Sequence, residues 1–333
     1  MDGMAIGTSA TAGKFRVAPR TFETIAAAAV WALVLTIISG AAVRLTGSGL
    51  GCPDWPKCTA SHVVAPLQIH AWIEFGNRLI NALVSIASVG SFAAALLRSP
   101  RRRDLTWLAA GLMIGLFLEV GLGAALVEAK LAPALVSAHF LLGLFFLGDA
   151  VVLHHRASLP DSSISTAPVR LVDRTNIRLS RLMVATTAVV AALGTVVTST
   201  GPHGGDPKAP RFHFSLHTVA QLHGTSVEVF LLLVVATLWN LSRTGAPGNV
   251  VRRGQFLLVS LGLQAVVGYA QYLNGDPVAL VSVHVAGAAV VVIAVIRYYV
   301  SLSVRPASPD SSTVESVTKA ASPIPLPVTV TSR

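Results

Sequence analysis

The sequence has little charge. Asp, Glu, Lys and Arg make up 12% of its 333 residues, against roughly 25% in a soluble globular domain. Hydrophobic residues make up 53%, and the mean hydropathy is +0.67. No internal segment resembles a soluble domain. This composition excludes a soluble protein and predicts an integral membrane protein.

The first apolar run, at about 25–43, lacks the features of a secretory signal peptide. It is longer than a signal-peptide core, and no small-residue cleavage site follows it. We therefore expect it to be a membrane-spanning helix, which needs about 20 apolar residues. Seven further runs of this length predict eight spans in all, at about 24–43, 71–97, 105–127, 133–153, 180–200, 216–241, 254–274 and 278–301.

Acidic residues are also few, and the formal charge is +10. In a soluble protein such a charge suggests nucleic acid, but here most Lys and Arg residues fall in alternate connections between the spans. The positive-inside rule then places both termini on the cytoplasmic side. We expect the membrane to be a bacterial plasma membrane. The basic residues left on the outer side are Arg44, Lys57, Arg78, Lys130, Lys208 and Arg211. Topology explains the charge, so no nucleic-acid partner is predicted.

The two halves of the chain resemble each other. The segment PALVSAH at 133–139 recurs as PVALVSVH at 277–284, and the shared LVS-x-H core has an offset of 145 residues. At this offset Glu119 corresponds to Gln264. Because the offset spans an even number of helices, it indicates a duplication in the same orientation.

We therefore predict an all-α membrane protein of two similar four-helix bundles arranged as a parallel pseudo-repeat. Its parts are a cytoplasmic tail (1–22), an N-terminal half (23–153), a cytoplasmic linker (154–179), a C-terminal half (180–302) and a disordered cytoplasmic tail (303–333).

Of ten histidines, three lie well inside the predicted spans, namely His139, His223 and His284. Each is six to eight residues past the outer helix start, roughly 9–12 Å deep, and Asn77 has the same depth. Such residues either form an interhelical bond worth about 0.6 kcal/mol or mark a function. His223 and His284 lie at matched depth on two helices of one half, which predicts axial ligation of a heme iron.

Ligands for zinc or copper are missing around these positions. The chain has two cysteines, both in the stretch 44–58, and no Cys or second His stands three or four residues from an in-span histidine. Zinc and copper sites need more ligands close by. Heme is therefore the favoured metal group.

Glu74 lies on the same helix face as Asn77 and Arg78, three and four residues later. It is either half of an interfacial Glu–Arg pair that anchors the helix, or a carboxylate beside a heme that moves protons. Both interpretations stay open. Glu119 and Glu228 also lie within spans, where we interpret them as bonds inside the bundle.

The stretch RLTGSGLGCPDWPKC at 44–58, the arrangement Glu74-x-x-Asn77-Arg78, the two four-span halves and the LVS-x-H repeat together resemble the heme A synthase family. The resemblance covers about residues 20–302. It implies a heme-dependent oxidoreductase of cytochrome oxidase assembly, which oxidises the C8 methyl of heme O to a formyl group by successive hydroxylations.

The resemblance also implies the site residues and the partners. A heme b cofactor would lie between His223 and His284 in the C-terminal half. The substrate heme site would lie in the N-terminal half with His139, Asn77 and Arg78, and with Glu74 as the catalytic carboxylate. Implied partners are heme O, membrane lipid, an unidentified electron donor and heme O synthase.

The outer-loop cysteine pair of the family corresponds to Cys52 and Cys58. The predicted topology puts both on the oxidising side, where disulfides persist. A crosslink over so short a loop stabilises by about 2 kcal/mol in the chain-entropy model. The pair is either a clamp that keeps the loop folded over the N-terminal pocket or a redox pair, and both interpretations stay open.

The sequence departs from the family at Asn77, where the usual residue is His. Asn is a poor iron ligand, so three outcomes are open. His139 alone binds the substrate iron, or His70 on the same helix face substitutes, or the N-terminal half has altered activity. We favour His139 alone, because a transient substrate needs weaker ligation than a cofactor.

Two other functions compete with an enzyme. One is a membrane b-type cytochrome that only transfers electrons, and the other is a heme-binding assembly factor. Two complete histidine pairs would favour electron transfer between two hemes. The incomplete pair at Asn77 argues against it.

Overall fold

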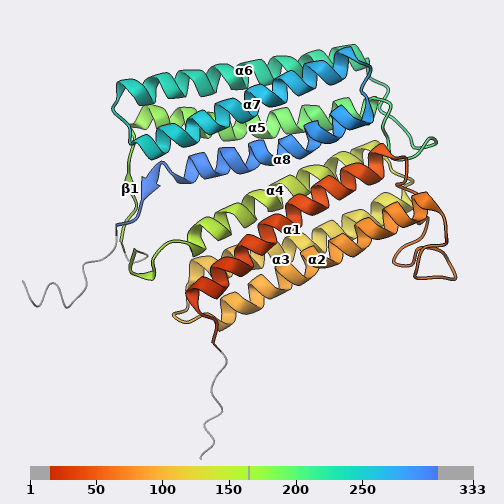
Figure 1. The fold of residues 1–333 in the computed structure, drawn as a ribbon, viewed down its shortest axis with the longest axis horizontal. Helices are drawn as coiled ribbons and strands as arrows, with labels where there is room; N and C mark the ends of the chain where they lie inside the picture. The colour runs from red at the N-terminus through yellow and green to blue at the C-terminus, as the bar shows by residue number, and fades with distance from the viewer. Residues whose placement is uncertain (1–15, 164–165, 307–333) are drawn as a thin grey trace, which may run out of the picture.

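The structure, a computed structural model, describes residues 16–163 and 166–306. In this part of the chain eight helices are long and apolar enough to cross a membrane, as expected for an all-α integral membrane protein (Figure 1). They are α1 (Pro19–Leu45), α2 (Ile69–Leu97), α3 (Arg103–Glu128), α4 (Pro133–Ala157), α5 (Arg174–Thr200), α6 (Leu216–Arg243), α7 (Gly248–Leu273) and α8 (Val278–Val300).

Several helices extend beyond the predicted spans. The predicted linker 154–179 is helical at both ends, because α4 continues to Ala157 and α5 begins at Arg174. A span predicted from hydropathy ends where basic residues begin, but the hydrogen-bonded helix backbone continues through these residues. Asp173 caps α5, since its Oδ1 accepts a hydrogen bond of 3.0 Å from the Asn176 N–H.

The remaining connection carries two short elements. They are the 3₁₀ turn η1 (Asp161–Ser163) and the strand β1 (Val169–Arg170). Strand β1 pairs antiparallel with β2 (Ser303–Val304), so the first residues of the predicted tail are ordered against the linker. The rest of that tail, from residue 307, and the N-terminal residues 1–15 lie outside the described residues.

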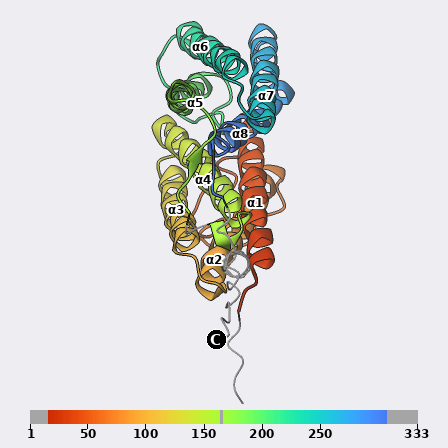
Figure 2. The same cartoon turned by 90° about the vertical axis from the view of Figure 1, so that its left-hand side faces the viewer.

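The helices form two four-membered rings. In the first, α1 contacts α2, α2 contacts α3, α3 contacts α4, and α4 returns to α1; helices α5 to α8 repeat this order. Figures 1 and 2 show the two rings side by side. This is the order that the predicted duplication requires, although the duplication itself stays a prediction.

Helix α8 joins the two rings. It contacts α1 and α4 as well as its own neighbours α5 and α7. Its Ala289 is fully buried in the apolar core of the N-terminal half, while Val291 and Tyr298 lie in the core of the C-terminal half. The halves therefore share a helix face and do not pack as independent bodies.

The outward faces of the helices carry large apolar side chains. Trp31, Trp107, Trp239 and Phe145 are 63–77% exposed. Water would make so much exposed aromatic surface unfavourable, whereas lipid hydrocarbon solvates it. This surface is therefore suited to contact with membrane lipid.

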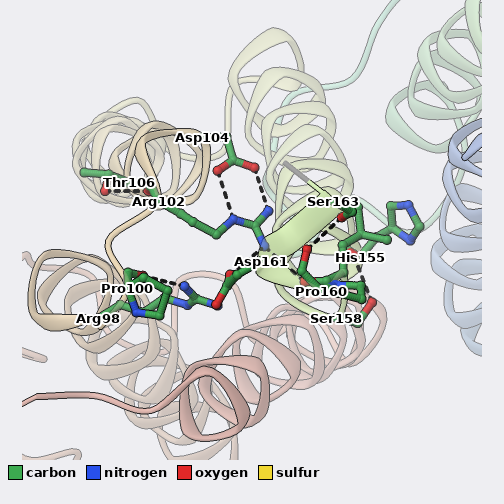
Figure 3. Close-up of polar contacts among 11 residues, drawn as sticks. Arg98, Pro100, Arg102, Asp104, Thr106, His155, Ser158, Pro160, Asp161 and Ser163 are labelled. Carbon is green, nitrogen blue, oxygen red and sulfur yellow. Dashed lines mark hydrogen bonds and ion pairs between the residues drawn. The ribbon is translucent and has the colours of Figure 1, made fainter. Parts of the chain in front are cut away.

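At the end of the molecule predicted to be cytoplasmic, two arginines are buried. Arg98 and Arg102 are 3% and 5% exposed. Asp161 Oδ1 accepts a hydrogen bond of 2.8 Å from Arg98 and lies 3.5 Å from Arg102 Nη1. Arg102 also donates two hydrogen bonds to Asp104 (Figure 3). This cluster ties the α2–α3 turn to the connection after α4.

We predict that Asp161→Asn lowers the free energy of unfolding by about 1–3 kcal/mol, because Arg98 stays buried after losing its charged partner. Unfolding in mixed detergent micelles would measure the change. Asp54→Asn, at an exposed carboxylate in the α1–α2 loop, should change stability by less than about 0.5 kcal/mol. Equal effects from the two substitutions would show that the cluster does not stabilise the fold.

Candidate functional site

The structure brings His223 of α6 and His284 of α8 together. Their ring centroids are 6.3 Å apart and their planes are inclined by 76°. Two imidazoles that bind one iron from opposite sides, each at a metal–nitrogen distance of about 2.0–2.1 Å, have ring centres roughly 6 Å apart. The pair therefore fits axial ligation of a single iron. No cluster of three or more metal-ligating His, Cys, Asp or Glu residues occurs within 16–163 and 166–306.

The two rings differ in their polar contacts. His223 Nδ1 lies 3.1 Å from the Val190 carbonyl, so its N–H donates there and leaves Nε2 for a metal. Gln264 donates a 2.8 Å hydrogen bond to the His284 backbone carbonyl. In the described chain, His284 Nδ1 is buried without a hydrogen-bond partner. Nδ1 of His284 is thus an unsatisfied polar atom at this site, whereas the Val190 carbonyl satisfies Nδ1 of His223.

Glycines let both rings approach the neighbouring helices. A Cβ atom at Gly194 of α5 would lie 3.1 Å from His223 Cε1, and one at Gly268 of α7 would lie 3.1 Å from His284 Cε1. In the N-terminal half, Gly123 of α3 faces His139 in the same way, at 3.7 Å. Each in-span histidine thus packs against a backbone that has no side chain.

The N-terminal half has different polar partners. His139 Nδ1 lies 2.5 Å from Oε2 of Glu119 on α3, a pairing that the sequence did not predict. Nδ1 is buried, and despite this close contact it has no hydrogen-bond partner; because the His139 side chain is 39% exposed, the opposite edge of the ring is the open one. Asn77 accepts a 2.7 Å hydrogen bond from Ser39 of α1. Asn77 and His139 therefore have separate partners.

Glu74 and Arg78 hold the loop between α1 and α2, residues 46–68, which we call the disulfide loop. Both carboxylate oxygens of Glu74 are used, since Oε2 accepts from the Cys52 N–H at 2.6 Å and Oε1 from Arg78 at 2.7 Å. Arg78 also donates to the carbonyls of Asp54 and Lys57, each at 3.0 Å. The predicted Glu–Arg pair thus anchors the loop to α2.

Cys52 and Cys58 form a disulfide, and both are fully buried. The loop packs closely on the start of α2, where a Cβ at Gly51 would overlap the His70 backbone. His70 Nδ1 lies 2.8 Å from Ser48 Oγ in the same loop. His70 is thus engaged by the loop at the start of α2, four residues before Glu74.

The disulfide loop also contacts the C-terminal half. The Gly49 N–H donates to the Gly205 carbonyl at 2.7 Å, and Arg44 of α1, just before the loop, donates through Nε to the His203 carbonyl at 2.7 Å. Ser137 and Ser199 lie 3.2 Å apart below this contact, on α4 and α5. Polar bonds therefore fix the two halves to each other at the end where both candidate sites lie.

Comparisons with known proteins give a consistent result. A family model described as "Cytochrome oxidase assembly protein" matches residues 23–202. The chain is similar to a protein named "Heme A synthase" from Geobacillus kaustophilus, with 32% identity over 114 residues, 33% of this chain and 35% of the relative. A protein of the same name from Bacillus cereus is 29% identical over 114 residues, 33% of this chain and 36% of the relative. These matches cover about a third of each relative's length.

We predict that Gly268→Val displaces His284, because the added side chain would overlap its ring, at an overpacking cost of about 1–3 kcal/mol. Bound heme per protein, measured from the absorbance of purified protein, should fall. Gly262→Val is the matched control on α7, since nothing lies within 4 Å of a Cβ at that position. Unchanged heme content in Gly268→Val would rule out close packing at His284.

Proposed function

Because the chain belongs to the cytochrome oxidase assembly protein family, whose model matches more than half of it, we propose that it is an oxidoreductase that converts heme O to heme A. The observation that carries the proposal is the His223–His284 pair, which fits a permanent heme, beside a second half with a single in-span histidine. The similarity to heme A synthases supports the same activity.

In this proposal the C-terminal half holds heme b. A bound heme b would supply one-electron redox chemistry to the reaction. His223 and His284 would be its axial ligands, and the Val190 carbonyl would keep Nε2 of His223 free by holding its Nδ1 proton. Gly194 and Gly268 give the two rings room against α5 and α7.

The N-terminal half would bind heme O, the substrate, through His139. Asn77 is held by Ser39, which favours ligation by His139 alone over ligation from α2. Single ligation suits a molecule that must enter and leave. The disulfide loop would cover this pocket and exclude water, held there by Arg78.

Glu74 would hold or move a proton beside the substrate. Its two oxygens are fixed by the Cys52 N–H and by Arg78, so its position is defined before substrate binds. A positioned general acid or base typically contributes 10²–10⁴-fold in rate. The disulfide itself supports a clamp that keeps this carboxylate and the loop together.

We further propose that the disulfide loop faces the outside of a bacterial plasma membrane and that both termini are cytoplasmic. The basic connections between α2 and α3, and between α6 and α7, support this orientation. Heme O would reach the N-terminal half from the membrane, delivered by heme O synthase.

The proposed activity can be tested by expressing the protein with a source of heme O in cells that lack their own enzyme. Chromatography of the extracted hemes should show heme A or its hydroxylated precursor. Bound heme b without either product would disprove the enzyme and leave an electron-transfer cytochrome or an assembly factor.

We predict that His223→Ala or His284→Ala removes the low-spin heme b absorbance of the purified protein, because each substitution deletes one axial ligand. His213→Ala, at an exposed histidine of the α5–α6 loop, should retain it. A low-spin b spectrum that survives in both ligand variants would show that other residues hold the heme.

We predict that Glu74→Gln retains the heme b spectrum but lowers product formation by about 10²–10⁴-fold. The amide keeps the size of the side chain and removes the charge. Limited proteolysis of the disulfide loop would show whether the loop stays closed. Normal product formation by Glu74→Gln would reduce Glu74 to an anchor of the loop.

A further inference from the structure

We infer that Glu119 is a positioning residue that holds His139 as an axial ligand of the substrate iron. The inference rests on the proposed function, in which His139 binds the substrate heme. It assigns a role to a carboxylate that lies outside the disulfide loop and outside the heme b pair.

The contact between the two side chains is direct. Oε2 of Glu119 on α3 lies 2.5 Å from Nδ1 of His139 on α4. A carboxylate within a membrane span is costly unless it is paired. Within the described residues, His139 is the one group within ion-pair distance of Glu119, while Nδ1 of His139 and Oε1 of Glu119 are both buried without a hydrogen-bond partner. The close contact therefore joins two buried groups that have no other partner.

The C-terminal half lacks this carboxylate. The residue corresponding to Glu119 is Gln264, whose amide bonds the backbone carbonyl of His284 and not a ring nitrogen. His223 meets a neutral backbone carbonyl at Nδ1. Among the described residues, a carboxylate thus contacts a histidine ring nitrogen only in the half proposed to bind the substrate.

This difference has a chemical consequence. A metal-bound histidine commonly donates its second N–H to a carboxylate or carbonyl, which fixes the tautomer and raises the basicity of the ligand. A charged acceptor makes the stronger hydrogen bond. Glu119 would bind Nδ1–H of His139, direct Nε2 to the iron and strengthen the one bond that holds it. This would offset the ligand that Asn77 does not supply.

The test is a titration of the purified full-length protein with heme O. The signal that His139→Ala removes defines binding at His139. Glu119→Ala should weaken that binding about 10–100-fold and lower the iron–histidine stretching frequency in the resonance Raman spectrum. Glu119→Gln should lower the frequency too, with a smaller loss of affinity, because it keeps a polar contact without the charge.

Glu128→Gln is the matched control, since Glu128 is exposed at the end of the same helix. It should leave affinity and frequency unchanged. Retention of the low-spin heme b spectrum shows that a Glu119 variant is folded. If Glu119→Ala does not fold, the test uses Glu119→Gln.

The inference is overturned if Glu119→Gln has the affinity and stretching frequency of the unmodified protein. It is also overturned if His139→Ala removes no signal, because His139 then binds no iron. If the unmodified protein forms no heme A but the His139 signal still depends on Glu119, the proposed function fails and the positioning role stands.

Discussion

A polar side chain inside an apolar helix bundle is stable only when another group satisfies it. Most helix backbone groups are already hydrogen-bonded internally, so the partners are mainly other side chains, a loop, or a backbone carbonyl of a neighbouring helix. Glu74 accepts hydrogen bonds from the Cys52 N–H and from Arg78. His139 contacts Glu119, and His223 bonds the Val190 carbonyl. These contacts set how the helices are rotated against one another. The direction in which each histidine points, and the closure of the disulfide loop, depend on them.

The two halves use one arrangement of helices with different polar partners. In the C-terminal half, two histidines face each other with neutral surroundings, as suits a cofactor that stays in place. In the N-terminal half, Ser39 donates a hydrogen bond to Asn77, and the Glu119 carboxylate contacts His139. Under the proposed function, the exchange of a few side chains would change a permanent heme site into a transient one without changing the fold.

Hydropathy predicted all eight spans, because apolar length is the main requirement for crossing a membrane. It missed the helix ends near Ala157 and Arg174, where charged residues continue the helix into the aqueous region. The depth of the three histidines also followed from counting residues along each helix. The Glu119–His139 contact could not be predicted in this way, since it depends on the rotation of α3 against α4. One signal was present: Glu119 precedes His139 by the same 20 residues that separate Gln264 from His284.

Helix α8 follows the other seven in the chain, yet its Ala289 completes the core of the N-terminal half. During synthesis, the first four helices therefore enter the membrane with an unfinished core. They reach their final packing only when the helix that bears His284 arrives. Under the proposed function, a nascent chain would not present a mature pocket for heme before the helix that bears His284 is in place. The shared helix would then keep an incomplete chain from binding heme that it could not oxidise.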